Sequence, residues 1–201
     1  MRLLRWLGRK RRKDSDEARA WRDAWLKAVE APDAAAVARL ETALRQRASP
    51  TLAKGAKAAE LRVADEVELE EEMLDGLRQL VELERELAAA RLPRVETSHR
   101  IVGADACHFS APVSLPDDPA QPTGRLLLTS ARAAFAGGAR VPALPWHAVR
   151  HVIQTGRDVT LVRAGAEDGC RFRCNSFGDA LCAAAIARYL TRPRRPGDRL
   201  V

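Results

Sequence analysis

The sequence predicts an α+β protein. An N-terminal helical segment, forming a hairpin or a short coiled coil, is followed by a small antiparallel β-barrel capped by a C-terminal helix. Three observations lead to this fold class. Apolar residues recur at steps of three and four through residues 14–92. Short apolar segments separated by turn residues follow from residue 93 onward. A last amphipathic stretch over residues 177–190 predicts the capping helix.

Charge is distributed unevenly along the 201 residues. Residues 1–13 hold seven of the 34 Lys and Arg residues and no acid, residues 14–92 carry 12 bases and 18 acids, and residues 93–201 carry 15 bases and 9 acids. The chain is therefore a basic tip, an acidic middle of net −6 and a basic C-terminal part of net +6, and its pI overstates any general affinity for polyanions. The opposite charges predict that the acidic helices fold over the barrel in a salt-sensitive contact.

The N-terminal tip, residues 1–13, is both basic and amphipathic. At helical spacing Leu3, Leu4 and Leu7 share a face with Trp6 beside it, and arginines lie opposite. This pattern is typical of a helix lying in an anionic membrane interface, where each Lys or Arg contributes about 1 kcal/mol. A solvated basic tail and sequence-independent nucleic-acid contact are the alternatives, the latter with no other support in the chain. The predicted membrane-binding residues are Arg2, Leu3, Leu4, Arg5, Trp6, Leu7, Arg9, Lys10, Arg11, Arg12 and Lys13.

Breaks at Pro32 and Pro50 divide the acidic segment into three predicted helices, at residues 14–30, 34–47 and 52–91. In the first helix we expect Trp21 and Trp25 to be core anchors. Asp33 is the expected N-cap of the second helix.

The third predicted helix has an apolar seam that suits a helical hairpin or a coiled coil, so residues 60–91 could form a homo-oligomer. Between residues 60 and 86 there are 11 acids against three bases, which make either a solvated face or a docking surface for a basic partner. The seam consists of Leu69, Met73, Leu77, Leu80, Leu83 and Leu87.

Leu92-Pro93 marks the boundary to the β segment, which we place at residues 93–191, with a basic tail at 192–201. A tight turn at Gly156 predicts a hairpin, and Ser176 with Asp179 predicts a capping box for the last helix. That helix should plug the barrel with Phe177, Leu181, Ala185 and Tyr189, with Ile186 alongside. The expected strands are residues 99–104, 106–113, 125–129, 132–136, 139–143, 149–155, 158–163 and 171–174.

Two motifs carry a resemblance to a known family. The first is Gly124-x-Leu-x-Leu-Thr-x-x-Arg-x-x-Phe-x-Gly, which contains Arg132 and Phe135, and the second is Pro145-Trp146-x-x-Val-x-x-Val. Residues 94–191 thereby resemble a pleckstrin-homology-like (PH-like) domain of the GRAM or bacterial type. The resemblance implies a seven-stranded bent barrel capped by a helix, which binds phosphoinositides, other membrane lipids or protein segments. Inositol-phosphate binders usually place a dense Lys/Arg cluster between the first strands, whereas here only His99 and Arg100 lie nearby.

Enzymatic and metal chemistry find little support. Cys170 and Cys174 lack a second matched pair of zinc ligands, and His108 beside Cys107 lacks a third member for nucleophilic catalysis. We therefore expect no metal, no cofactor and no enzymatic activity, and an enzyme with an unrecognised site is the least favoured reading.

The function expected from these patterns is that of a non-enzymatic binding module. It would be a peripheral membrane or protein-interaction adaptor whose partner is a protein or an anionic membrane lipid. The alternative is a cytosolic protein-only adaptor that oligomerises through the acidic helices. Four cysteines are too few for a disulfide scaffold, and no run approaches the roughly 20 apolar residues of a spanning helix. We expect a cytoplasmic protein, peripheral on the inner face of the cell membrane if the tip binds there. The Ala and Arg richness is typical of a bacterial genome of high GC content.

Overall fold

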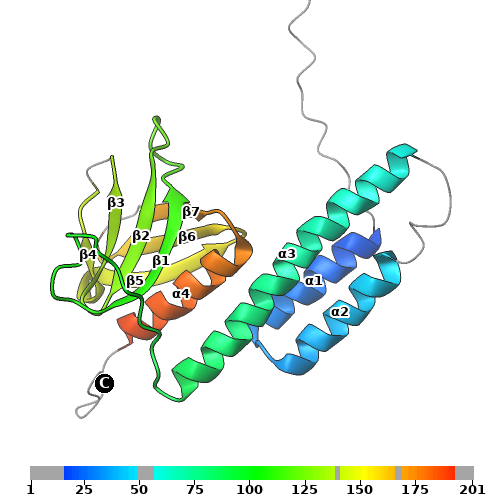
Figure 1. The fold of residues 1–201 in the computed structure, drawn as a ribbon, viewed down its shortest axis with the longest axis horizontal. Coiled ribbons are helices and arrows are strands. Elements are labelled where there is room, and N and C mark those ends of the chain that lie inside the picture. Colours follow the sequence, from blue (N-terminus) through cyan, green and yellow to red (C-terminus); the bar gives the residue numbers. More distant parts are fainter. Residues whose placement is uncertain (1–15, 49–56, 139–140, 166–168, 193–201) are drawn as a thin grey trace, which may run out of the picture.

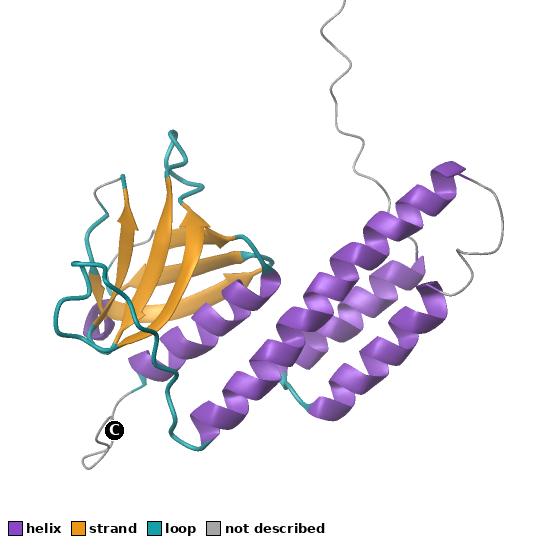
Figure 2. Ribbon diagram, in the orientation of Figure 1, coloured by secondary structure: helices purple, strands orange, loops and turns teal. Residues whose placement is uncertain are grey.

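The computed structural model describes residues 16–48, 57–138, 141–165 and 169–192. It confirms the α+β class: helices come first, a seven-stranded antiparallel sheet follows, and a C-terminal helix ends the described chain (Figures 1 and 2). The predicted tip at residues 1–13 lies outside the described residues, as do residues 193–201 of the predicted tail.

Three helices, α1 (Asp16–Glu30), α2 (Ala34–Ala48) and α3 (Lys57–Ala88), pack together through their apolar faces. Both predicted core tryptophans are buried and hydrogen-bonded. Trp21 Nε1 donates to the Leu40 carbonyl at 2.9 Å, and Trp25 Nε1 donates to the Met73 carbonyl at 2.7 Å. The predicted N-cap of α2 is also confirmed, because Asp33 Oδ1 accepts from the Ala36 amide at 2.6 Å.

The predicted seam of α3 is an intramolecular contact surface. Its residues Met73, Leu77, Leu80 and Leu87 are buried in a cluster with side chains of α1, α2 and the C-terminal helix, and Leu69 and Leu83 pack against that cluster from its margin. The seam that suited a coiled coil is thus covered within the chain itself.

A buried ion-pair cluster joins the three helices. Glu70 of α3 has no exposed surface and pairs with Arg47 of α2 and, at 3.4 Å, with Arg22 of α1. Arg47 also lies 3.6 Å from Glu66 and 4.0 Å from Glu17. Burial raises the pKa of Glu70 above its ordinary value, although Arg47 and then Arg22 act in the opposite direction.

The sheet has the strand order β4-β3-β2-β1-β7-β6-β5, and all of its pairings are antiparallel. It is not closed into a barrel, which corrects the predicted architecture. β4 has only two residues and a 3-10 turn at Trp146–Ala148 separates it from β5, so these two strands remain the edges of the sheet. The strands are β1 (Cys107–Ser114), β2 (Thr123–Thr129), β3 (Arg132–Gly137), β4 (Leu144–Pro145), β5 (Val149–Thr155), β6 (Asp158–Arg163) and β7 (Gly169–Cys174).

Two predicted strands were wrong. Residues 99–104 form turns, in which the Val102 amide donates to the His99 carbonyl and Gly103 has φ +64°. Val102 is buried because it packs with Leu127 on the face of the sheet opposite the main core. The fourth strand lies at residues 144–145, whereas the described part of the predicted strand 139–143 is irregular.

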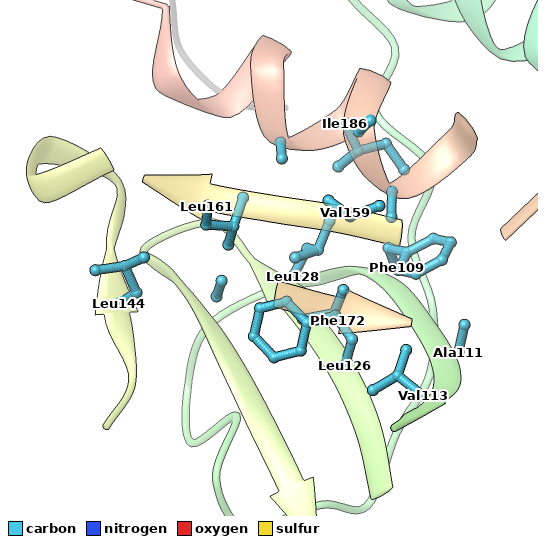
Figure 3. Packing of buried hydrophobic residues seen from close by; sticks show 14 of the residues in the cluster. Phe109, Ala111, Val113, Leu126, Leu128, Leu144, Val159, Leu161, Phe172 and Ile186 are labelled. Carbon is cyan, nitrogen blue, oxygen red and sulfur yellow. The ribbon is translucent and has the colours of Figure 1, made fainter. Parts of the chain in front are cut away.

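The C-terminal helix α4 (Phe177–Thr191) lies between the sheet and the helical bundle (Figure 1). Its Ser176 cap is confirmed, because Ser176 Oγ accepts from the Asp179 amide at 3.0 Å. Of the residues predicted to face the sheet, Ile186 does so, but Leu181 and Ala185 belong to the bundle core, and Phe177 and Tyr189 pack against it. α4 is apolar on both sides, so periodicity alone could not tell which side meets the sheet. Figure 3 shows Ile186 of α4 beside Val159 of the sheet. The α4 residues that pack in the sheet core are Ala180, Ala183, Ala184, Ile186, Ala187 and Leu190.

α3 and α4 cross at two glycines. A Cβ at Gly76 would lie 2.8 Å from the backbone nitrogen of Gly178, so α3 could not carry a side chain there unless the helices moved apart. A Cβ at Gly178 would instead meet the end of the Gln79 side chain, which can turn away. Beside the crossing, Glu72 pairs with Arg157 of the β5–β6 turn and accepts from the Phe177 amide at 3.1 Å. The acidic helices thus contact the rest of the chain mainly through apolar side chains of α4, with this ion pair at the margin, and not through the broad charge contact that net charge predicted.

Candidate functional site

A hollow on the sheet side of the molecule, here the β3 pocket, lies between the turns at residues 99–101 and the end of β3. Its volume is about 720 Å³. His99 and Arg100 are exposed bases, and Ile101, Val141 and Pro142 add apolar surface. A pocket with bases beside an apolar wall suits a ligand that has both an anionic and an apolar part. The complete lining is His99, Arg100, Ile101, Phe135, Ala136, Gly137, Val141 and Pro142.

The Leu-Thr-Ser-x-Arg motif anchors the segment that forms one wall of this pocket. Arg132 Nη2 donates to the Ile101 carbonyl at 3.3 Å and lies 3.7 Å from Asp105 Oδ2. Thr129, which is fully buried, donates to Asp105 Oδ2 at 3.3 Å or to the Arg132 carbonyl at 3.0 Å. Trp146 Nε1 in turn donates to the Thr129 carbonyl at 2.8 Å. Arg132 therefore positions the pocket wall and does not itself line the pocket.

The two glycines of the motif make room for one aromatic ring. Gly124 and Gly137 are paired across β2 and β3, and a Cβ at either would lie 2.5–2.6 Å from ring atoms of Phe135. The Phe135 ring therefore lies between two positions that only glycine can occupy without displacing it.

We predict that Arg132→Ala loosens the pocket wall without unfolding the protein. The substitution removes one hydrogen bond and one partly exposed ion pair, and should lower the free energy of unfolding by about 1–2 kcal/mol. Amide hydrogen exchange at residues 101–105 should become faster, while that of β5 and β6 stays unchanged. Arg163→Ala, at an exposed position of β6, is the matched control. Equal exchange in both variants would contradict the anchoring role.

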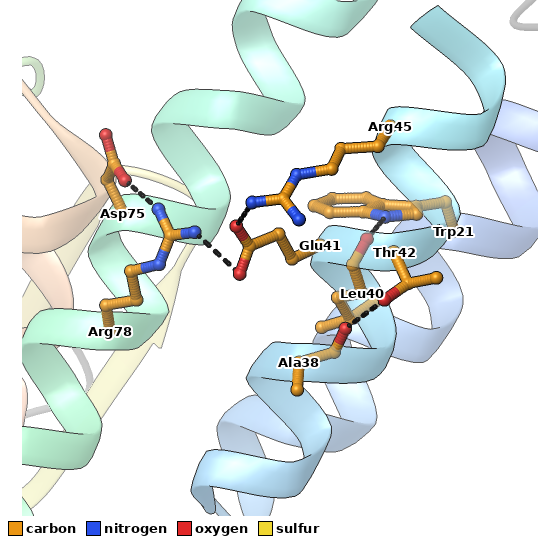
Figure 4. A network of polar contacts seen from close by, with 8 residues as sticks. All are labelled: Trp21, Ala38, Leu40, Glu41, Thr42, Arg45, Asp75 and Arg78. Atoms are coloured by element: carbon orange, nitrogen blue, oxygen red, sulfur yellow. Dashed lines mark hydrogen bonds and ion pairs between the residues drawn. The ribbon is translucent and has the colours of Figure 1, made fainter. Parts of the chain in front are cut away.

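A second concave surface, the helix groove, runs between α2 and α3. It consists of two hollows of about 280 and 610 Å³ that share Arg78. Arg78 pairs with Glu41 at 3.1 Å and with Asp75 at 2.6 Å, so it bridges the two helices (Figure 4). The smaller hollow is lined by Glu41, Leu44, Arg45, Glu71, Leu74, Asp75 and Arg78, and the larger one by Ala34, Val37, Arg78, Gln79, Val81 and Glu82.

A third hollow, of about 580 Å³, lies where the β5–β6 turn meets the end of β7. Its two guanidinium groups already have carboxylate partners. Arg173 binds both oxygens of Asp158, at 2.8 and 3.0 Å, and Arg157 pairs with Glu72. With its positive charges neutralised inside the chain, this hollow is a weaker anion site than the β3 pocket.

The sequence's candidate thiol and imidazole groups are not assembled for chemistry. Cys107 Sγ donates to the Phe109 carbonyl at 3.2 Å, whereas His108 Nδ1 lies 2.8 Å from the Pro93 carbonyl, so the neighbours bind different backbone groups. Burial raises the pKa of Cys174 to about 12 and that of Cys182 to about 11, so neither thiol readily forms the reactive thiolate. In the described part of the chain, no group of three or more His, Cys, Asp or Glu side chains could hold a metal ion.

The structure therefore describes only some of the predicted site residues. The membrane-binding residues 2–13 lie outside the described residues and stay a prediction. His99 and Arg100, noted as the bases nearest the first strands, do line a pocket. Sequence analysis missed its apolar wall, because it assigned Ile101 and Val141 to strands. Within the described ranges, no helix has both the length and the apolar character needed to cross a membrane.

No protein-family model matches the chain, and no curated protein is significantly similar to it in sequence.

Proposed function

We propose that this chain is a non-enzymatic binding module that attaches to an anionic membrane surface and holds the anionic end of an amphiphile in the β3 pocket. The observation that carries the proposal is the composition of that pocket: the bases His99 and Arg100 stand beside the apolar side chains of Ile101 and Val141. The basic tip at residues 1–13 would supply the general attraction, and the pocket a second contact.

A PH-like domain is part of the same proposal. Seven antiparallel strands in the order β4-β3-β2-β1-β7-β6-β5, with one C-terminal helix packed against them, are compatible with that resemblance. The open edge between β4 and β5 would then be the gap of a partly open barrel. The motif residues Thr129, Arg132 and Trp146 would serve the fold and shape the pocket, and the ligand would meet His99 and Arg100.

The experiment is flotation of the full chain with vesicles of phosphatidylcholine alone and with added phosphatidylglycerol. We expect binding only to the anionic vesicles. Deleting residues 1–13 should abolish it, and Arg100→Ala should weaken it about fivefold, because one base near the surface contributes about 1 kcal/mol. Arg163→Ala, an exposed base on β6, should bind like the wild type. If both Arg variants lost binding equally, general charge attraction alone would explain the binding, and the pocket contact would be excluded. If the full chain did not float with anionic vesicles, the proposal would be overturned.

A second candidate is the protein-only adaptor, and the helix groove favours it, because such a groove can receive a partner helix. Self-association through residues 60–91 would have to use surface other than the buried seam around Leu77, or open the bundle. A mass near 22.1 kDa by light scattering at high concentration would count against the homo-oligomer.

A further inference from the structure

The helix groove has two ends of different chemistry. The smaller hollow carries three carboxylates beside Leu44 and Leu74. Glu41 and Asp75 already pair with Arg45 and Arg78, so the net negative charge of this hollow is that of the exposed Glu71. The larger hollow is mostly apolar, with Val37 and Val81 half-buried at its surface. Four carboxylates and two guanidiniums line the whole groove, so it favours a ligand that is basic at one end and apolar at the other.

Residues 1–13 have this composition in the same chain. Residues 3–7 contain three leucines and Trp6, and residues 9–13 are five consecutive bases. The tip carries +7, whereas residues 14–92, which include the groove, carry −6.

The order of these parts along the chain matches the order of the hollows along the groove. At the start of α1, Glu17 lies 4.0 Å from Arg47, near the end of α2 that borders the acidic hollow. If the chain before residue 16 followed the groove from this end, residues 9–13 would come to the acidic hollow first and residues 3–7 to the apolar hollow next.

Length allows the contact as well. From Glu70 to Glu82 along α3 is about 18 Å, at about 1.5 Å of rise per residue. Residues 8–15 alone can extend over about 26 Å, at about 3.3 Å per residue.

We propose that the basic tip docks into the helix groove of its own chain, with its apolar residues on Val37 and Val81 and its bases on the rim carboxylates. The contact goes beyond the proposed function, because it requires no membrane. It would shelter the apolar face of the tip away from lipid, so membrane and groove compete for one segment. Occupancy of either site lowers occupancy of the other by the same factor.

Limited trypsin digestion of the full chain tests the contact, because all seven bases of the tip are cleavage sites. If the tip is docked about nine-tenths of the time, cleavage within residues 1–13 is about tenfold slower than for a free segment. We expect Val81→Asp and the exposed substitution Glu71→Lys to restore fast cleavage. Leu26→Asp and Asp23→Lys place the same changes on exposed positions of α1 and should leave cleavage slow. Equal cleavage rates in the wild type and all four variants would overturn the proposal.

A disulfide trap identifies the occupant. A chain carrying Leu4→Cys and Val81→Cys should form an intramolecular cross-link at least tenfold faster than a chain carrying Leu4→Cys and Ala24→Cys, whose second thiol lies on an exposed face of α1. A cross-link between two chains would assign the groove to a second copy and overturn the intramolecular contact.

The two proposals fail separately. Slow cleavage without flotation would retain the groove contact and remove the membrane function, and flotation with unprotected tips would do the reverse. If both proposals are correct, the Glu71→Lys variant should bind vesicles at a several-fold lower lipid concentration than the wild type. In that variant no free energy is needed to release the tip from the groove before it binds the membrane.

Discussion

Trp25→Ala is expected to lower the free energy of unfolding by about 3–5 kcal/mol, a large part of the stability of an ordinary domain. The indole is only 2% exposed, and its Nε1 donates to the Met73 carbonyl at 2.7 Å. Its ring also meets the Phe177 ring edge-on, with centroids 5.6 Å apart. One side chain of α1 therefore contacts both α3 and α4, and its removal opens a cavity where these helices meet.

Urea unfolding measures this effect, and two variants separate its causes. Trp25→Phe keeps an aromatic ring but removes the indole N–H, which leaves the Met73 carbonyl without that donor. This variant should lower the free energy of unfolding by a smaller amount, about 1–3 kcal/mol. Leu26→Ala changes the next residue, which is 55% exposed, and should stay within about 0.5 kcal/mol of the wild type. A loss below 1 kcal/mol for Trp25→Ala would contradict the packing of α1 described above.

Arg47→Ala should be as damaging, for an electrostatic reason. It leaves the fully buried carboxylate of Glu70 with Arg22 as its remaining cation, and breaking a buried pair in this way costs about 3–5 kcal/mol. The double variant Arg47→Met with Glu70→Leu removes both charges and should recover most of the loss.

The pH dependence follows from the raised pKa of Glu70. Because the folded protein holds this proton more tightly than the unfolded chain, the resulting stability is fully present below about pH 4.3, the ordinary pKa of glutamate, and is lost as pH rises through the raised value. Loss of Arg47 raises that pKa further. The destabilisation by Arg47→Ala should therefore be largest at neutral pH and shrink toward acid pH in urea titrations. In a Glu70→Gln background this change with pH should disappear, and its persistence would assign it to other carboxylates.

Local chemistry in the sequence predicted most elements of this fold. Asp33 and Ser176 located the starts of two helices, and the turn at Gly156 located a hairpin, because each acts through contacts a few residues away. The prediction of secondary structure and packing failed where a contact with a residue distant in sequence determines the conformation. Ile101 and Val102 have the apolar character of a strand, yet they form turns because Leu127 offers them a surface behind the sheet. Likewise, nothing near Leu181 indicates that its partner is the helical bundle and not the sheet.

The candidate site could be predicted only in part, for the same reason. His99 and Arg100 were recognisable as bases near the first strands, but the wall that completes their pocket comes from the far end of β3. The motif residue Arg132 was recognised only as part of the family resemblance, and its hydrogen bond to the Ile101 carbonyl joins residues 31 positions apart, so the sequence did not indicate it. The helix groove has no motif at all, because it arises only when α2 and α3 pack together.

The position of α4 between two cores has a consequence for synthesis of the chain. Leu181 and Ala185 complete the cluster around Leu77, although more than 90 residues separate them in sequence. On the ribosome the three helices emerge long before α4 does, so their apolar face stays without its cover until about residue 191 has been made. The border at Leu92-Pro93 is therefore no place to divide the protein for expression. A fragment ending there would lack part of its core, and one beginning there would carry Leu181 and Ala185 exposed to water.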